Sequence, residues 1–483
     1  MSLTRSEDPV DEETPILPHD DVPQRPTPLP TLQVLIVLLE RIAETTALNS
    51  ISPYINQLIS ELPIVSGDSR RVGYYTGIIL SLYFAAEAVT VLQWNRLSDR
   101  VGRKPILLSG LLGTIVSITL FGLSRSFWAL VVCRFLNGAL NGNIGVTKSM
   151  LAELTDKTNV ARGFSMMPLA GAIGQILGSF IGGIFARPQD RWPDAFSHPF
   201  WAEYPYFLPC LVVAAFAVLQ FVITAVFLEE TVDRKSGLQA TEADSDGVGE
   251  GTGNTPDPSP EDTEQPLPLR SLLTRPVVIC IANYAILALL DIAAVALIPL
   301  IWSTPIELGG LNLSPASIGL WMSGYGFTSA IFQFVFFPHI VGHLGPRRVI
   351  IISAAVFAVI YLLFPLENLV VRGVNAVVGP FIILQLLLIS FSDMGFSSVF
   401  MYISTAAPNK RSLGATNGLA QTVVSIQRAV GPAIAASLFA FSLENNILGG
   451  NFVYVVLLFF VYLGLHVAVQ LPKETWNHND KGK

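Results

Sequence analysis

Long apolar runs alternate with short polar stretches along almost the whole chain. An apolar stretch of about 20 residues can cross the roughly 30 Å hydrocarbon core of a bilayer as a helix. Twelve such stretches lie near residues 32–59, 73–94, 106–124, 127–151, 163–186, 206–228, 277–301, 317–338, 349–366, 376–402, 413–440 and 451–471. The pattern therefore predicts an all-α membrane protein with 12 transmembrane helices.

The composition supports a membrane protein. The 483 residues are 51% hydrophobic and only 13% charged, whereas a typical soluble domain is roughly a quarter charged. The net charge of −7 provides no basic field for nucleic acid, so the expected surroundings are a lipid bilayer. Cys133, Cys210 and Cys280 all fall inside apolar runs, which is typical of small packed side chains rather than of disulfides.

The polar stretches divide the chain into segments. The acidic, Gly- and Pro-containing stretch 229–276 is predicted to be a disordered cytosolic linker. It separates two predicted six-helix bundles, residues 31–228 and 277–472, as in a duplicated six-helix unit. The acidic, proline-rich residues 1–30 predict a disordered cytosolic tail, and residues 473–483 a second cytosolic tail.

The distribution of basic residues predicts the orientation. The two tails and the loops on their side of the membrane hold 19 of the 29 Lys and Arg residues, so both termini are expected in the cytosol. Asn312 begins an Asn-Leu-Ser glycosylation sequon in a loop on the opposite side, and Pro315 after it lowers the expected occupancy. We expect a multi-pass protein of the plasma membrane or the vacuolar membrane.

The loop after the second apolar stretch carries a specific motif. Residues 95–105 read NRLSDRVGRKP, a short cationic turn whose one acid, Asp99, can pair with a nearby Arg or cap a helix. This loop resembles the GxLxDRxGRK motif of the major facilitator superfamily. The resemblance implies that Asp99, Arg100, Gly102 and Arg103 form a conformational latch, which holds helices together in one state and releases them in another.

Further motifs extend the resemblance from residue 31 to residue 472. Arg134 to Gly138 is similar to the RxxQG element of the family, with Asn137 for Gln. The fifth stretch resembles the GPxxGG element of the antiporter branch, with Ser179 for Pro, and the eleventh has a related Gly-Pro pair. We expect these small residues to serve helix packing: Gly174, Gly178, Gly182, Gly183, Gly431 and Pro432.

The chain is therefore identified as a member of this superfamily. It resembles the twelve-span drug:proton antiporter branch and, more narrowly, fungal relatives of the zinc-induced-facilitator-like group. The resemblance implies a major facilitator fold of two six-helix bundles, a small-molecule substrate, coupling to protons and a monomeric state. It implies no cofactor.

Ionisable residues inside the apolar stretches are the candidate site. Such groups are costly in a bilayer and are usually functional. The candidates for proton coupling or a substrate cavity are Arg41, Glu44, Glu87, Arg134, Asp291, Asp393 and Arg428. Asp291 and Glu44 are the leading proton carriers, while the alternative is that these groups form ion pairs that hold helices together. Glu40 and Lys148 are expected nearer the interface, where long side chains reach water.

These observations predict a secondary active transporter, not an enzyme. The leading hypothesis is proton-coupled efflux or vacuolar sequestration of a small organic compound or metal complex by alternating access. The alternatives are a proton-coupled nutrient symporter and a non-transporting membrane sensor with the same fold. No metal site is predicted, because the six histidines are scattered and only His339 and His343 have helical ligand spacing.

Overall fold

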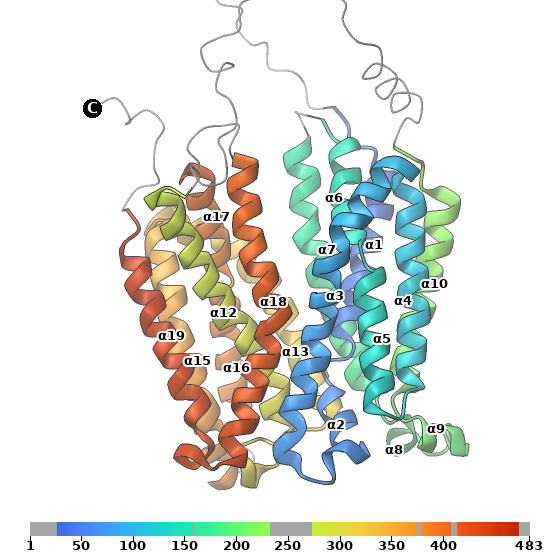
Figure 1. The fold of residues 1–483 in the computed structure, drawn as a ribbon, viewed down its shortest axis with the longest axis vertical. Helices are drawn as coiled ribbons and strands as arrows, with labels where there is room; N and C mark the ends of the chain where they lie inside the picture. Colours follow the sequence, from blue (N-terminus) through green and yellow to red (C-terminus); the bar gives the residue numbers. More distant parts are fainter. Residues whose placement is uncertain (1–26, 157–158, 232–272, 374–377, 407–412, 473–483) are drawn as a thin grey trace, which may run out of the picture.

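The fold consists of helices packed into two bundles. The computed structural model describes residues 27–156, 159–231, 273–373, 378–406 and 413–472, and these residues contain no strand. Figure 1 shows the two bundles side by side. Most of the predicted linker and of both predicted tails lies outside the described residues.

The first bundle contains the helices before residue 231. Its long elements are α1 (Thr31–Asn49), α3 (Val72–Val101), α4 (Arg103–Gly122), α5 (Phe127–Leu140), α6 (Asn143–Glu153), α7 (Val160–Phe185) and α10 (Phe207–Phe227). Short helices form one end of this bundle: α2 (Ile55–Ser60), η1 (Pro63–Val65), η2 (Ser69–Arg71), α8 (Pro188–Arg191) and α9 (Pro199–Glu203). We call this bundle the N half.

The second bundle, the C half, contains the helices after residue 273. Its elements are α12 (Arg275–Ser303), η3 (Ile306–Leu308), α13 (Pro315–Ile331), η4 (Phe332–Phe336), α14 (Phe337–Leu344), α15 (Pro346–Gly373), α16 (Val378–Ser392), α17 (Met394–Ala406), α18 (Leu413–Glu444), η7 (Ile447–Gly450) and α19 (Phe452–Val469). The π-helical turn η4 joins α13 to α14, so one helical rod runs from residue 315 to residue 344.

Ten helical segments of the described chain are long and apolar enough to cross a membrane. The other two predicted crossings have polar interruptions. Helix α1 carries Glu40, Arg41 and Glu44, and it ends at Asn49 rather than running on to residue 59. The predicted fourth crossing is broken at Asn141 and Gly142 into α5 and α6.

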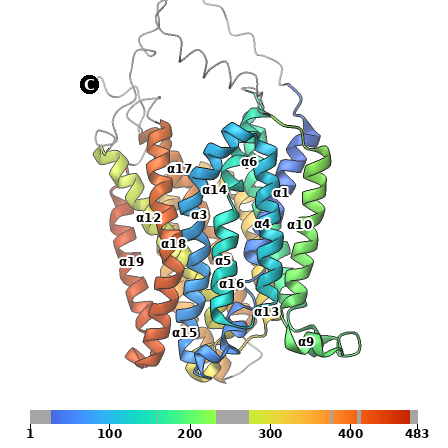
Figure 2. The same ribbon diagram turned by 45° about the vertical axis from the view of Figure 1, so that its right-hand side comes forward.

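The two halves meet along two helix pairs, α7 with α13 and α3 with α18. Their close contacts concentrate at the end of the molecule where α3 begins and α18 ends. There a Cβ at Gly77 would lie 2.9 Å from the Ala433 Cα, and the Ser81 hydroxyl accepts a hydrogen bond of 2.8 Å from the Ala433 N–H. We call this end the closed end; Figure 1 shows α2 near it, and Figure 2 shows α9 near it and α6 toward the opposite end.

Candidate functional site

An ion pair in α1 forms the centre of a polar cluster in the N half. The Arg41 Nη1 donates to Glu44 Oε2 at 2.8 Å, one helical turn apart. The other oxygen of Glu44 accepts a hydrogen bond of 3.0 Å from the Asn141 amide, which also donates to the Tyr83 hydroxyl. The break between α5 and α6 therefore places a side-chain amide against a buried carboxylate.

Glu40 is a buried acid that the sequence analysis placed wrongly near the interface. Its side chain is only 1% exposed, and it accepts hydrogen bonds from Asn143 Nδ2 at 2.6 Å and Thr147 Oγ1 at 2.8 Å. Both donors come from α6, directly after the break. Lys148, by contrast, is exposed. Asn143 is a polar residue within a predicted apolar stretch. This polarity could have indicated that Asn143 has a buried polar partner such as Glu40.

Arg134 on α5 is the most deeply buried cation of this cluster. It is 1% exposed, and its guanidinium lies over the Tyr83 ring at 4.9 Å from the centroid. Its Nε and Nη1 atoms have no hydrogen-bond partner among the described residues. A buried guanidinium without a carboxylate is costly, so Arg134 offers donors to an anionic or polar group that enters the cluster.

Glu87 connects the N-half cluster with the C half. This half-buried carboxylate on α3 interacts electrostatically with Arg41 and Glu44 of its own half. It also interacts with Arg428 of α18 and with Lys148, and both of these cations are exposed. Charged groups of the two halves therefore face each other between α3, α6 and α18.

Two aspartates form the polar cluster of the C half. Asp393, between α16 and α17, accepts hydrogen bonds from the Tyr325 hydroxyl at 3.1 Å and the Ser329 hydroxyl at 2.5 Å, both on α13. Asp291 on α12 interacts electrostatically with Asp393 and with Arg428. Its Oδ1 atom is buried and has no hydrogen-bond partner in the described part of the chain.

Sequence and structure agree in part on this site. Arg41 and Glu44 do form an ion pair, but both residues lie on α1, so this pair does not hold two helices together. Among the described residues, no cationic side chain lies within 4 Å of the Asp291 carboxylate. An ion pair therefore does not account for this acid. The hydrogen-bonding side chains of Tyr83, Asn141 and Tyr325 had no sequence signal that separated them from packing residues.

The expected latch loop lies entirely within the N half. Arg103 pairs with Asp99 at 2.5 Å and with Glu153 at the end of α6 at 2.9 Å. The first N–H groups of α4, of Arg103 and Lys104, donate to Glu230 at 2.8 and 3.1 Å. The acid that caps α4 is therefore Glu230, which the sequence analysis missed, and not Asp99.

The backbone of the loop requires its glycine. Gly102 has a φ of +115°, a backbone conformation that residues with a Cβ atom rarely adopt. A Cβ there would also collide with the Glu230 carboxylate. Arg100, the remaining residue of the motif, is exposed. The loop thus joins the ends of α3, α4, α6 and α10 to one another.

The glycines of α7 lie at two different helix contacts. A Cβ at Gly174 would lie 2.7 Å from the Ile42 carbonyl of α1. A Cβ at Gly178 would lie 2.5 Å from the Thr46 carbonyl of the same helix. Gly182 continues this row against the Ser50 carbonyl of the residue that follows α1. In the C half, a Cβ at Gly431 would meet the Ile292 side chain of α12 at 2.7 Å, and the neighbouring Pro432 lies against Gly77 of α3.

Gly183 faces the other half of the molecule. A Cβ there would lie 2.7 Å from both the Gly319 Cα and the Pro315 carbonyl of α13. The backbones of α7 and α13 therefore pack closely here, at the closed end.

Potential metal ligands do not gather in the described residues. No group of three or more His, Cys, Asp or Glu side chains with metal-binding geometry occurs there. His339 and His343 are both exposed on α14.

These features define a polytopic helical membrane protein with two bundles, buried charges within them and charged groups facing each other between them, the arrangement of a secondary transporter. The sequence profile of the Major Facilitator Superfamily matches residues 35–310 and 288–483. The chain belongs to this superfamily of transporters, and it is not an enzyme.

Characterised relatives cover most of the chain. It is 30% identical to the major facilitator-type transporter psiT2 of Psilocybe cubensis, over 98% of this chain and 99% of that protein. It is 30% identical to the major facilitator superfamily multidrug transporter mfsB of Aspergillus fumigatus, over 86% of this chain and 80% of the relative. It is 28% identical to Protein ZINC INDUCED FACILITATOR-LIKE 1 of Arabidopsis thaliana, over 82% and 81%. The predicted branch is thereby confirmed.

Solved structures show the same fold. A bacterial homologue of the human lysosomal transporter Spinster, in an inward-facing and unoccupied conformation, superposes with a TM-score of 0.60 at 14% identity, over 93% of this chain and 98% of that one. The predicted major facilitator fold is confirmed by this likeness and by the helices described above.

Proposed function

We propose that this chain is a proton-coupled exporter, which moves a small organic compound out of the cytosol across the plasma membrane or into the vacuole. Relatives that carry the names multidrug transporter and efflux pump support export of organic compounds. The carboxylates of Glu87, Asp291 and Asp393, which lie within membrane-spanning helices or at their ends, support coupling to protons.

The proposed orientation places the closed end away from the cytosol. The basic loops lie at the opposite end, where the positive-inside rule puts the cytosol. With the halves joined at the closed end, this arrangement corresponds to the state that receives substrate from the cytosol. Rocking of one half against the other would then release the substrate on the far side.

The observation that carries the proposal is the state of Asp291. Its buried Oδ1 has no hydrogen-bond partner among the residues that the structure describes, and a carboxylate in that position is least costly to bury when it holds a proton. Asp393 lies near enough to interact with it, so two ionised carboxylates would repel each other at this place. Arg428 provides the opposite charge that favours proton release when it approaches.

A cycle follows from these contacts. When the halves rock, the distance between Arg428 on α18 and Glu87 on α3 changes, because these residues lie in different halves. Asp291 on α12 lies in the same half as Arg428, so the Arg428 side chain can turn toward Asp291 when Glu87 moves away and back toward Glu87 when it returns. The approach of the cation to Asp291 favours loss of its proton, and its withdrawal favours uptake. Proton binding is in this way tied to the position of the halves, which is the requirement for coupled transport.

The first experiment identifies the substrate. The gene is deleted in its host, and growth is screened against drugs, metals and the secondary metabolites of the host. A compound to which only the deletion strain is sensitive is then used in proteoliposomes with an imposed proton gradient.

The second experiment tests Asp291. We expect Asp291→Asn to abolish gradient-driven transport while protein abundance and exchange of substrate without a gradient persist. Glu307→Gln, which changes an exposed acid of the same half, should leave transport unaffected. Normal gradient-driven transport by Asp291→Asn would exclude this residue from the mechanism.

A further inference from the structure

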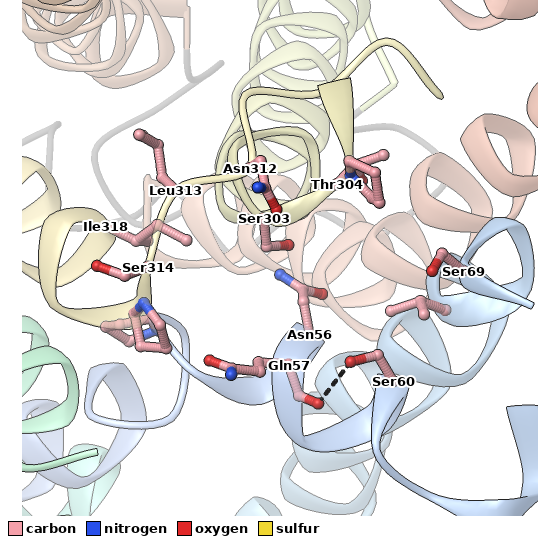
Figure 3. Close-up of a pocket in the computed structure, with 14 residues that line it drawn as sticks. Asn56, Gln57, Ser60, Ser69, Ser303, Thr304, Asn312, Leu313, Ser314 and Ile318 are labelled. Carbon is pink, nitrogen blue, oxygen red and sulfur yellow. Dashed lines mark hydrogen bonds between the residues drawn. The ribbon is translucent and has the colours of Figure 1, made fainter. Parts of the chain in front are cut away.

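A pocket of about 360 Å³ lies between the two halves at the closed end (Figure 3). The N half contributes side chains from α2 and from η2, including Asn56, Gln57 and Ser69. The C half contributes the end of α12 and the loop before α13, including Ser303 and Asn312. Pockets that hold small ligands usually measure about 300–1,000 Å³, so the volume suits a small molecule.

The pocket contains a buried amide without a partner. Asn56 is only 2% exposed, and neither its Oδ1 nor its Nδ2 has a hydrogen-bond partner in the described residues. Figure 3 shows its side chain between Gln57 and Ser303, near the middle of the ring of labelled residues. A buried amide that makes no hydrogen bond destabilises the fold, so the pocket gains stability from any group that supplies both a donor and an acceptor.

The surrounding groups are mainly acceptors. The hydroxyls of Ser60, Ser303 and Thr304 donate their single hydrogens to backbone carbonyls at 2.8, 2.9 and 2.7 Å. They therefore present only lone pairs to the pocket. The Gln57 Oε1 atom is also buried and has no partner among the described residues. A ligand that fits this set carries several O–H donors.

No charged side chain stands among the pocket-lining residues that the structure describes. A cationic ligand would find no carboxylate to balance it, and an anionic ligand would find no Lys or Arg. The charged clusters of the two halves contribute none of the lining residues, so this pocket is separate from the proposed proton-coupling site.

We propose that this pocket is a second ligand site, which binds a neutral, polyhydroxylated molecule from the non-cytosolic side. Because both halves line it, a bound molecule contacts both and stabilises the arrangement in which the closed end stays shut. The site would thus allow a solute outside the cytosol to slow the transport cycle. This proposal goes beyond the proposed export function.

The test uses protection from chemical labelling. All three native cysteines are buried, so Ser69→Cys provides one reactive thiol in the pocket, and Ser66→Cys provides a matched exposed thiol on the same loop outside it. The protein is produced without N-glycosylation because Asn312 lines the pocket. It is then labelled in nanodiscs with a maleimide in the presence of glucose, glucosamine or gluconate.

We expect glucose to slow labelling of Ser69→Cys several-fold, with no effect on Ser66→Cys. The cationic glucosamine and the anionic gluconate should protect much less than glucose. Adding Asn56→Leu should remove the protection. Gln57→Leu, at a less buried position, should weaken the protection. If Asn56→Leu does not fold, the result for Gln57→Leu alone tests the proposal. Absence of protection by glucose, equal protection by all three compounds, or full protection in both folded leucine variants would overturn the proposal.

Discussion

Replacing Gly183 by alanine would test whether the contact of α7 with α13 holds the closed end together. The added Cβ would lie 2.7 Å from the Gly319 Cα and from the Pro315 carbonyl. Nonbonded carbon atoms prefer a separation of about 3.5–4.0 Å, so the two helices must move apart by roughly 1 Å. The atoms in the way are backbone atoms, which cannot turn aside as a flexible side chain can.

The magnitude follows from the cost of overpacking. An extra methyl group in a tightly packed contact costs about 1–3 kcal/mol. Because the cost exists only while the halves touch at this end, it shifts the ratio of closed to open molecules by about 5- to 150-fold. Gly319→Ala should act in the same direction, since its Cβ would lie 2.5 Å from the Ser179 carbonyl of α7.

The assay is a distance measurement between spin labels at Ser66 and Asn445, exposed positions of the N and C halves at the closed end. The native Cys133, Cys210 and Cys280 are buried and should not compete for the label. We expect the population with the longer distance to increase in both glycine variants.

Matched controls come from the same two helices. Gly171 on α7 and Gly324 on α13 have no atom within 4 Å of an added Cβ. Alanine at either position raises helix propensity by about 1 kcal/mol without touching the other half. If Gly183→Ala and Gly319→Ala give the same distance distribution as these controls, the contact does not set the balance between the two states.

Three further variants test individual contacts. Thr147→Val removes a donor from the buried Glu40 and should lower the free energy of unfolding by about 1–3 kcal/mol, measured by thermal denaturation in detergent. Arg71→Ala breaks the 3.3 Å pair with Glu444 between the halves, and because both side chains are partly exposed it should open the closed end by no more than about 1 kcal/mol in the spin-label assay. Glu230→Ala removes the cap of α4 and should cost about 0.5–2 kcal/mol of stability, visible as a lower unfolding temperature.

Each of these variants has a control. Thr147→Ser keeps the hydroxyl and should approach wild-type stability, so an equal loss in both variants would contradict the role of the hydrogen bond. Glu229→Ala changes the exposed acid beside Glu230 and should leave the unfolding temperature unchanged. If Arg71→Ala opened the closed end more than Gly183→Ala does, packing would not be the stronger contact.

Hydropathy predicted the crossings well wherever a helix exposes much of its surface to lipid, because such a helix is apolar over most of its length. It misplaced the end of α1 and missed the break between α5 and α6, where polar residues face protein rather than lipid. Glu40 illustrates the reason: its position near the start of an apolar stretch suggested the interface, but donors 103 and 107 residues later in α6 allow it to be buried. Such a pairing depends on tertiary contacts and leaves no local pattern.

Glu367 is a buried acid that the sequence analysis did not consider. The predicted ninth crossing ended at residue 366, whereas α15 continues to Gly373 and leaves Glu367 fully buried beside Trp302. Pro365 lies inside this helix and does not end it. The motif residues, in contrast, could be located from sequence because a short loop with fixed spacing defines its own geometry, although the capping acid Glu230 comes from a distant segment.

Helix α7 touches a helix of its own bundle and a helix of the opposite bundle with consecutive residues. Gly182 abuts the residue after α1, while Gly183 abuts α13. A slight roll of α7 about its long axis therefore cannot relieve crowding on one side without creating it on the other. A larger side chain on the α1-facing side of α7 would therefore also shift the contact between α7 and α13. The size of the residues along α7 is limited by the transport cycle as well as by folding.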